Sequence, residues 1–185
     1  MTIHPHHIPD LERLSQYMQP PMLMLGAHGS AIPGFKTAGE YFAQWVGGKY
    51  FEVDLDGGHW RRDLNEDLRF PTCYGTVFNL GTIEHVWNVH NAWVNALRAV
   101  EVGGHFLNHS PVAGYRNHGL HITSEPAIRA FVSKNGFNIL DAWITYRAVG
   151  DTLWLAAVKE RHIEDLADFE PAWQVYEEGQ KKAVR

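Results

Sequence analysis

The sequence predicts an α/β fold: a three-layer sandwich with a mostly parallel, Rossmann-like sheet and an antiparallel last strand. Short apolar runs alternate with segments whose apolar residues recur every three or four positions. Strands that alternate with helices require parallel crossovers, so helices should cover both faces of one sheet. The last two apolar segments are joined by only a Val149-Gly150 turn, which predicts an antiparallel pair.

Size and composition favour one soluble domain over residues 1–185. The hydrophobic fraction is 45%, the charged fraction is 20% and the net charge is −5, so a nucleic-acid partner is not indicated. The sequence contains neither a transmembrane-length apolar run nor an apparent secretory signal, so no membrane association is expected. The single cysteine, Cys73, cannot form an intrachain disulfide, and a cytoplasmic location is the expectation.

The first part of the chain predicts a lead-in, a strand and a crossover helix. Residues 1–20 form the lead-in, with a helix from Asp10 to Met18 that Asp10 caps. An apolar strand from Pro21 to Leu25 follows, and after a glycine-containing loop a helix runs from about Lys36 to Val46. A mobile end is expected for the three histidines before the lead-in helix: His4, His6 and His7.

The same alternation continues to the carboxyl-terminal part of the chain. The further predicted strands are Tyr50 to Leu55, Gly75 to Gly81, His105 to Ser110, Phe137 to Ala148 and Asp151 to Glu160. The further predicted helices are Glu84 to Val100 and Thr123 to Asn135. Residues 161–185 read as a helical tail that packs back on the domain, and a homodimer contact is the alternative.

Two features at strand ends are typical of a site for a nucleoside-containing ligand. The loop from Leu25 to Ser30 (LGAHGS) carries Gly26 and Gly29, which let a ligand approach the backbone ahead of a helix. Asp54 ends the second strand, where a carboxylate can accept hydrogen bonds from ribose hydroxyls. An ordinary turn and a solvated carboxylate are the alternatives, and the combination is more specific than either part.

A carboxylate and several histidines follow the third and fourth predicted strands. Glu84 and His85 open a helix, and His109, His118 and His121 cluster farther along the chain. These side chains could hold a divalent metal or supply a general base, or the histidines could simply hold their loop. We favour structural or substrate-positioning histidines, and the expectation is that no metal is bound.

The stretch from Tyr50 to Pro111 resembles the short-form class I S-adenosylmethionine-dependent methyltransferases. The matching segments are FEVDLDGG, RDLNEDL, GTVFNLGTIEHV and ALRAVEVGGHFLNHSP, with KNGFNILD after the next helix. The likeness extends over roughly Met22 to Val158. In this family an acidic residue normally precedes the glycine-rich loop, and here Met24 stands there. His28 replaces the loop's middle glycine.

The resemblance implies a methyltransferase that uses S-adenosylmethionine and acts on a small-molecule or biosynthetic-intermediate O- or N-acceptor. The Gly26–Ser30 loop would face the amino-acid part of the cofactor, Asp54 the ribose, and the Asp63-Leu64 pair the adenine. The implied cofactor-binding residues are Gly26, His28, Gly29, Asp54, Leu55, Asp63, Leu64 and Leu80. The expected catalytic residues, one of which accepts the acceptor's proton, are His85, His118 and His121.

Two other functions stay open at the level of sequence. The altered glycine loop would also fit a methyltransferase-like domain without catalysis that acts as a partner or scaffold, and the histidines would fit a metal-dependent enzyme. A nicotinamide-dependent dehydrogenase is disfavoured because the full GxGxxG pattern is missing.

Overall fold

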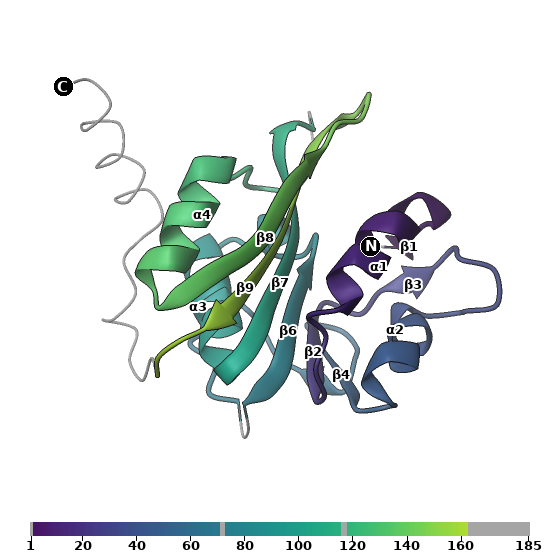
Figure 1. Ribbon diagram of the computed structural model, residues 1–185, viewed down its shortest axis with the longest axis horizontal. Coiled ribbons are helices and arrows are strands. Elements are labelled where there is room, and N and C mark those ends of the chain that lie inside the picture. The colour runs from purple at the N-terminus through teal and green to yellow at the C-terminus, as the bar shows by residue number, and fades with distance from the viewer. Residues whose placement is uncertain (1, 71–72, 116–117, 163–185) are drawn as a thin grey trace.

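The computed structural model describes residues 2–70, 73–115 and 118–162, which form a sheet between two layers of helices (Figure 1). The strands are β1 (Thr2–Ile3), β2 (Met22–Leu25), β3 (Gly29–Ser30), β4 (Tyr50–Asp54), β5 (Trp60–Arg61), β6 (Tyr74–Leu80), β7 (Val100–Gly114), β8 (Phe137–Thr145) and β9 (Gly150–Lys159). The helices are η1 (Pro5–His7), α1 (Ile8–Ser15), α2 (Ala38–Val46), η2 (Ile83–His85), α3 (Val89–Ala99) and α4 (Glu125–Lys134). None of these helices is long and apolar enough to span a membrane.

The main sheet has seven strands in the order β5-β4-β2-β6-β7-β9-β8. The first five pair in parallel, whereas β9 runs antiparallel to both of its neighbours. A separate short parallel pair joins β1 to β3. The predicted three-layer α/β sandwich with an antiparallel last strand is therefore confirmed.

The helices cover both faces of the sheet, with α1 and α2 on one side and α3 and α4 on the other (Figure 1). Strand β2 explains why its sequence is wholly apolar. Leu23 and Leu25 lie in the core beneath α3 and α4, whereas Met22 and Met24 lie in the core beneath α1 and α2. Alternate side chains of a strand point to opposite faces, so a strand covered on both faces must be apolar throughout.

The lead-in of the chain is ordered, and the expectation of a mobile histidine-bearing end is wrong. His4, at the N-cap of η1, leads into η1 and α1, and His7 is buried with its ring 5.4 Å from the ring of His109. Buried Ile3 and Leu11 pack into the core beneath α1 and α2, and this burial fixes the segment. Sequence position alone is a poor guide to disorder when the backbone is buried and paired.

Two helix boundaries differ from the expected ones. Helix α1 begins at Ile8, so Asp10 lies in its first turn, where the Asp10 carboxylate accepts a hydrogen bond from Trp143 Nε1 at 2.7 Å instead of capping the helix. The predicted helix from Glu84 is split into η2 and α3, because Asn88 caps α3 by accepting a hydrogen bond from the Asn91 backbone N–H at 3.1 Å. The apolar residues keep their helical spacing across this break, so the sequence pattern does not indicate it.

The fourth predicted strand is longer than expected. Strand β7 begins at Val100 and runs through Gly103 and Gly104, ahead of the predicted start at His105. A Cβ atom at Gly104 would lie 2.9 Å from the Gly75 carbonyl oxygen, so glycine permits the close approach of β7 to β6. The predicted helical tail and its dimer contact fall almost entirely on residues 163–185, which lie outside the described residues.

Candidate functional site

A cavity of about 360 Å³ lies at the carboxyl edge of the sheet, where β2 and β6 are neighbours. The strand order reverses at this pair, since the chain builds the sheet outward from β2 through β4 and β5 and then returns to β6. Open α/β sheets bind ligands at such switch points. The cavity is lined by Gly26, Ala27, His28, Asp54, Gly81, Thr82, His85 and His118.

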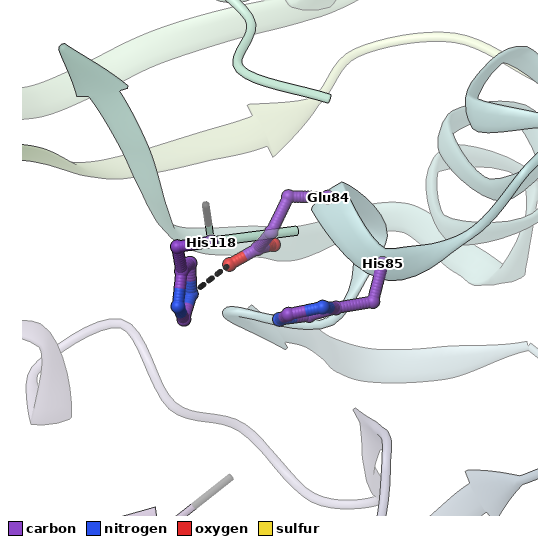
Figure 2. Close-up of side chains that lie close together, drawn as sticks. All are labelled: Glu84, His85 and His118. Carbon is purple, nitrogen blue, oxygen red and sulfur yellow. Dashed lines mark ion pairs between the residues drawn. The ribbon is translucent and has the colours of Figure 1, made fainter. Parts of the chain in front are cut away.

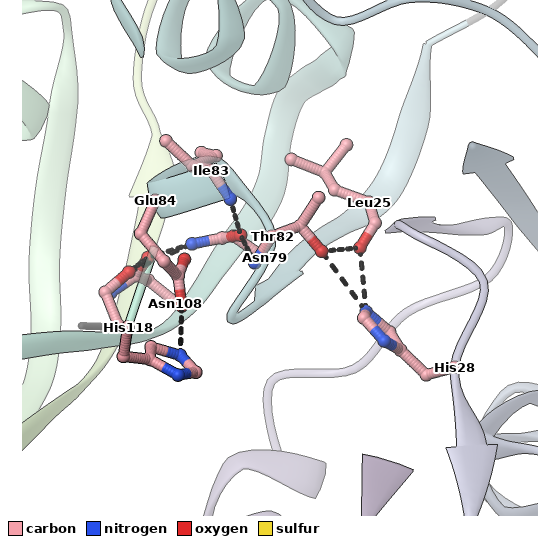
Figure 3. Close-up of polar contacts among 9 residues, drawn as sticks. Leu25, His28, Asn79, Thr82, Ile83, Glu84, Asn108 and His118 are labelled. Atoms are coloured by element: carbon pink, nitrogen blue, oxygen red, sulfur yellow. Dashed lines mark hydrogen bonds and ion pairs between the residues drawn. The ribbon is translucent and has the colours of Figure 1, made fainter. Parts of the chain in front are cut away.

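A buried histidine in the loop after β2 contacts the residues that follow β6. His28 Nε2 lies 3.0 Å from the Leu25 carbonyl oxygen and 3.3 Å from Thr82 Oγ1, and the Thr82 hydroxyl donates to the same carbonyl at 2.6 Å (Figure 3). Gly26 has φ +85°, and a Cβ atom there would lie 2.6 Å from Thr82 Oγ1. Only glycine fits this turn without strain, whereas the His28 ring fills the space that a smaller residue would leave.

Asp54 also holds the loop after β2, through its side-chain carboxylate. Its Oδ2 accepts the Ala27 backbone N–H at 2.8 Å, and its Oδ1 accepts the Asp56 N–H at 3.1 Å. Partial burial acts to raise the pKa of this carboxyl, but backbone hydrogen bonds from Ala27, Asp56 and Leu55 outweigh it and lower the pKa. A charged carboxylate oxygen has room for more than one donor, so Asp54 can hold the loop and still accept a ligand hydroxyl.

Asn79 organises the end of β6, and its role was not anticipated from the sequence. This fully buried side chain accepts the backbone N–H groups of Thr82 and Ile83, each at 3.1 Å (Figure 3). Its amide donates to Asn108 Oδ1 at 2.8 Å and to Ser110 Oγ at 3.0 Å. A signal was present, because Asn79 and Asn108 are register partners within two otherwise apolar strands.

The far side of the cavity brings a buried carboxylate against two imidazoles. Glu84 Oε1 lies 4.0 Å from His118 Nε2, and the His85 and His118 rings are 5.0 Å apart (Figure 2). The Glu84 side chain is only 4% exposed, and burial raises its pKa to about 7. Burial, followed by the proximity of His118, lowers the pKa of His85. Three polar side chains thus converge, two from η2 and one from the loop after β7.

The backbone explains why the two loops meet. The Glu84 carbonyl accepts the N–H groups of Leu120 and His121 at 2.7 and 3.0 Å. Gly119, with φ +71°, allows this contact, because a Cβ atom there would lie 2.9 Å from the same carbonyl oxygen. The chain after β7 is therefore bonded to η2, and His118 is carried to the cavity by that attachment.

The structure brings together five of the eleven residues that the sequence placed in the site. Those that line the cavity are Gly26, His28, Asp54, His85 and His118. Ala27, a further lining residue, lies in the Gly26–Ser30 loop that was predicted to face the cofactor. The sequence did not single out Gly81 and Thr82, because their contribution is mainly backbone or a short side chain next to a strand end.

The other expected site residues lie outside the cavity lining. Gly29 pairs in β3, Leu64 and Leu80 are buried in the two cores, and Leu55 is exposed. Asp63 Oδ1 accepts two hydrogen bonds from Asn65, at 2.8 and 2.7 Å. His121 Nε2 lies 3.1 Å from the Trp87 carbonyl oxygen, so its ring links two loops.

No protein-family model and no curated protein sequence matches the chain. Among solved structures, Burkholderia thailandensis 1,6-didemethyltoxoflavin-N1-methyltransferase, with bound 1,6-didemethyltoxoflavin and S-adenosylhomocysteine, is similar at a TM-score of 0.61 and 15% identity, over 83% of this chain and 77% of that one. N-methyltransferase NodS from Bradyrhizobium japonicum WM9 has a TM-score of 0.59 and 16% identity, over 84% of this chain and 96% of that one. An S-adenosylmethionine-dependent methyltransferase from Mesorhizobium loti has a TM-score of 0.58 and 14% identity, over 83% of this chain and 97% of that one. The chain therefore has the fold of these methyltransferases.

Proposed function

We propose that this protein is an S-adenosylmethionine-dependent methyltransferase that acts on a small-molecule or biosynthetic-intermediate O- or N-acceptor. The observation that carries the proposal is the cavity at the β2–β6 switch point, with Asp54 on one wall and His85 and His118 on the other. Its volume of about 360 Å³ is that of a small-molecule site, which spans about 300–1,000 Å³ in proteins.

The residues on the Asp54 wall fit the polar part of the cofactor. Gly26 and Ala27 offer backbone with almost no side chain, and the carboxylate of Asp54 is suited to accept ribose hydroxyls. The Asp63-Leu64 pair is assigned to the adenine end, and the Asp63 carboxylate is held in place by two hydrogen bonds from Asn65. The remaining assigned cofactor residues are His28, Gly29, Leu55 and Leu80.

When bound, the cofactor supplies a sulfonium methyl group for in-line transfer to a nucleophile. The chain itself has to bind, orient and shield the two reactants, and such positioning can account for much of the rate. His85 and His118 line the cavity after β6 and β7, whereas Asp54 lines it at the end of β4, on the other side of β2 in the sheet. An acceptor hydroxyl or amine can reach an imidazole nitrogen there. His121, on the same loop as His118, is assigned to the acceptor side with them.

The type of acceptor is the open part of the proposal. Two of the similar structures are N-methyltransferases by name, which supports a nitrogen acceptor alongside an oxygen acceptor. Methyl transfer to either atom needs the same in-line geometry, so the fold is compatible with both.

Calorimetric titration with S-adenosylhomocysteine tests the cofactor half of the proposal. We expect saturable binding to the wild type and a ten- to hundredfold loss in Asp54→Ala, because removal of charge-assisted hydrogen bonds costs about 1.5–3 kcal/mol. Asp54→Asn separates the charge from the support of the loop, since an amide oxygen can still accept the Ala27 N–H. Asp56→Ala is the matched control, because the Asp56 side chain is 87% exposed.

The outcomes of this titration are distinct. Equal affinities for the wild type and Asp54→Ala would remove Asp54 from the binding site. A wild type that does not bind S-adenosylhomocysteine would refute the methyltransferase proposal itself.

A methyltransferase-like domain without catalysis is the second candidate, and the His28 ring in the glycine loop favours it. This candidate predicts that neither S-adenosylmethionine nor S-adenosylhomocysteine raises the melting temperature of the wild type. It also predicts that His28→Gly, which opens the loop, restores such a shift. A ligand-induced rise in the wild type would exclude this candidate.

A further inference from the structure

We propose that Glu84, His85 and His118 bind a divalent first-row transition-metal cation beside the cavity (Figure 2). Each of the three side chains offers one ligand atom, and these atoms all lie within 4.8 Å of one another. The sequence alone favoured no metal site; the proposal differs because the fold brings Glu84 and His85 together with His118.

The carboxylate of Glu84 is the strongest reason for a cation. Its side chain is 4% exposed, and neither carboxylate oxygen has a hydrogen-bond partner among the residues that the structure describes. A carboxylate that is withdrawn from water is costly unless a positive charge or a donor compensates it. One carboxylate oxygen is directed at the His118 imidazole, and the His85 ring lies near the pair (Figure 2). A cation held among the three side chains would supply that compensation.

The geometry requires only side-chain movement. Metal–ligand distances of about 2.0–2.2 Å place ligand atoms roughly 3–3.5 Å apart, somewhat closer than in the structure. His85 is exposed and the His118 side chain is 39% exposed, so both rings can rotate inward while Glu84 stays in place. The hydrogen bonds from Leu120 and His121 to the Glu84 carbonyl hold the backbones of the two loops together during this adjustment.

The donor set indicates which cations fit. Two imidazoles and one carboxylate are typical ligands of zinc and of non-haem iron, whereas Mg²⁺ prefers oxygen ligands. Three protein ligands leave coordination positions open, and His85 and His118 line the cavity. An acceptor oxygen could occupy such a position. That consequence rests on the proposed function, whereas the metal site does not.

Titration of the metal-free full chain with Co²⁺, followed by calorimetry and by visible absorption, tests the site. We expect one equivalent to bind the wild type and an affinity loss of about 100-fold or more in Glu84→Gln and in His118→Ala, since even the loss of partners outside the ligand shell costs about 10–100-fold. The controls are His6→Ala and His162→Ala, which remove exposed histidines elsewhere and should leave the affinity unchanged.

Thermal unfolding adds a readout that a merely structural role of Glu84 would not give. In the presence of a chelator, Glu84→Gln should melt no lower than the wild type, because the variant buries a neutral amide instead of a carboxylate. Co²⁺ should raise the melting temperature of the wild type and not that of Glu84→Gln.

Three results would overturn the metal site: no Co²⁺ binding by the wild type, equal affinity in the wild type and Glu84→Gln, or loss of binding in His6→Ala instead. Parallel titration with S-adenosylhomocysteine keeps the two proposals apart. A wild type that binds S-adenosylhomocysteine but not Co²⁺ refutes only the metal site, and the opposite pattern refutes only the cofactor assignment.

Discussion

Buried polar residues, more than the lining residues themselves, hold the candidate site in shape. Asn79 accepts hydrogen bonds from two backbone N–H groups at the start of η2 and donates to Asn108 and Ser110 on β7. This one side chain therefore sets the position of the segment that carries Glu84 and His85. Buried hydrogen-bond networks of this kind favour one arrangement, because a polar group that loses its partner is costly in a dry interior.

Replacement of Asn79 by leucine should be strongly destabilising. Asn79→Leu leaves two backbone N–H groups without their acceptor and removes the amide that donates to Asn108 and Ser110, which keep only the hydrogen bond between them. The free energy of unfolding should fall by about 2–4 kcal/mol. Urea unfolding monitored by fluorescence measures the change. Asn138→Leu, at an exposed position of β8, is the control and should stay within about 0.5 kcal/mol of the wild type. Comparable losses in both variants would contradict the network's role.

At the scale of elements, the lead-in of η1 and α1 is joined to the sheet through aromatic and histidine contacts. The His7 ring lies 5.4 Å from that of His109, which in turn lies 4.2 Å from the ring of Trp154. Burial, followed by the charge of neighbouring His6, lowers the pKa of His7 to about 3. Burial, followed by the effect of His7, also lowers the pKa of His109 well below its ordinary value.

These two histidines make the fold sensitive to acid. The unfolded chain takes up their protons below a pH of about 6.5, whereas the folded chain does not, so stability is full above that pH and falls as the pH is lowered. Each histidine contributes a slope of at most about 1.4 kcal/mol per pH unit. His7→Phe should therefore reduce the pH dependence between about pH 6 and pH 4 by up to that amount.

Urea unfolding of the wild type and His7→Phe at a series of pH values checks this prediction. Other groups titrate in both proteins, so the difference between the two slopes reports His7 together with its effect on neighbouring His109. Parallel curves for the two proteins would show that His7 does not stay neutral in the folded state.

Some secondary-structure elements could be predicted from the sequence and others could not. The buried parallel strands were predictable, because a strand such as β2 that is covered on both faces must be apolar throughout. The order of the lead-in could not be predicted, because the burial of His7 depends on His109, a residue far away in the chain. The break at Asn88 was missed because the apolar spacing continues across it.

At the scale of the whole molecule, the site was predictable where it depends on strand ends. Asp54 lies at the end of a predicted strand, and Gly26 and His85 follow two others. Parallel strands bring their carboxyl ends to one edge of the sheet. The proximity of Glu84 to His118 could not be predicted from strand ends. It depends on backbone hydrogen bonds between a short helix and a distant loop, which no local pattern encodes.

A crystal structure of the wild-type protein with S-adenosylhomocysteine tests the central claim most directly. We expect the ligand in the cavity between the ends of β2 and β6. Its ribose hydroxyls should lie within hydrogen-bond distance of the Asp54 carboxylate, and its sulfur should be directed toward the wall formed by His85 and His118. A ligand bound elsewhere, or a cavity that stays empty at saturating ligand concentration, would contradict it.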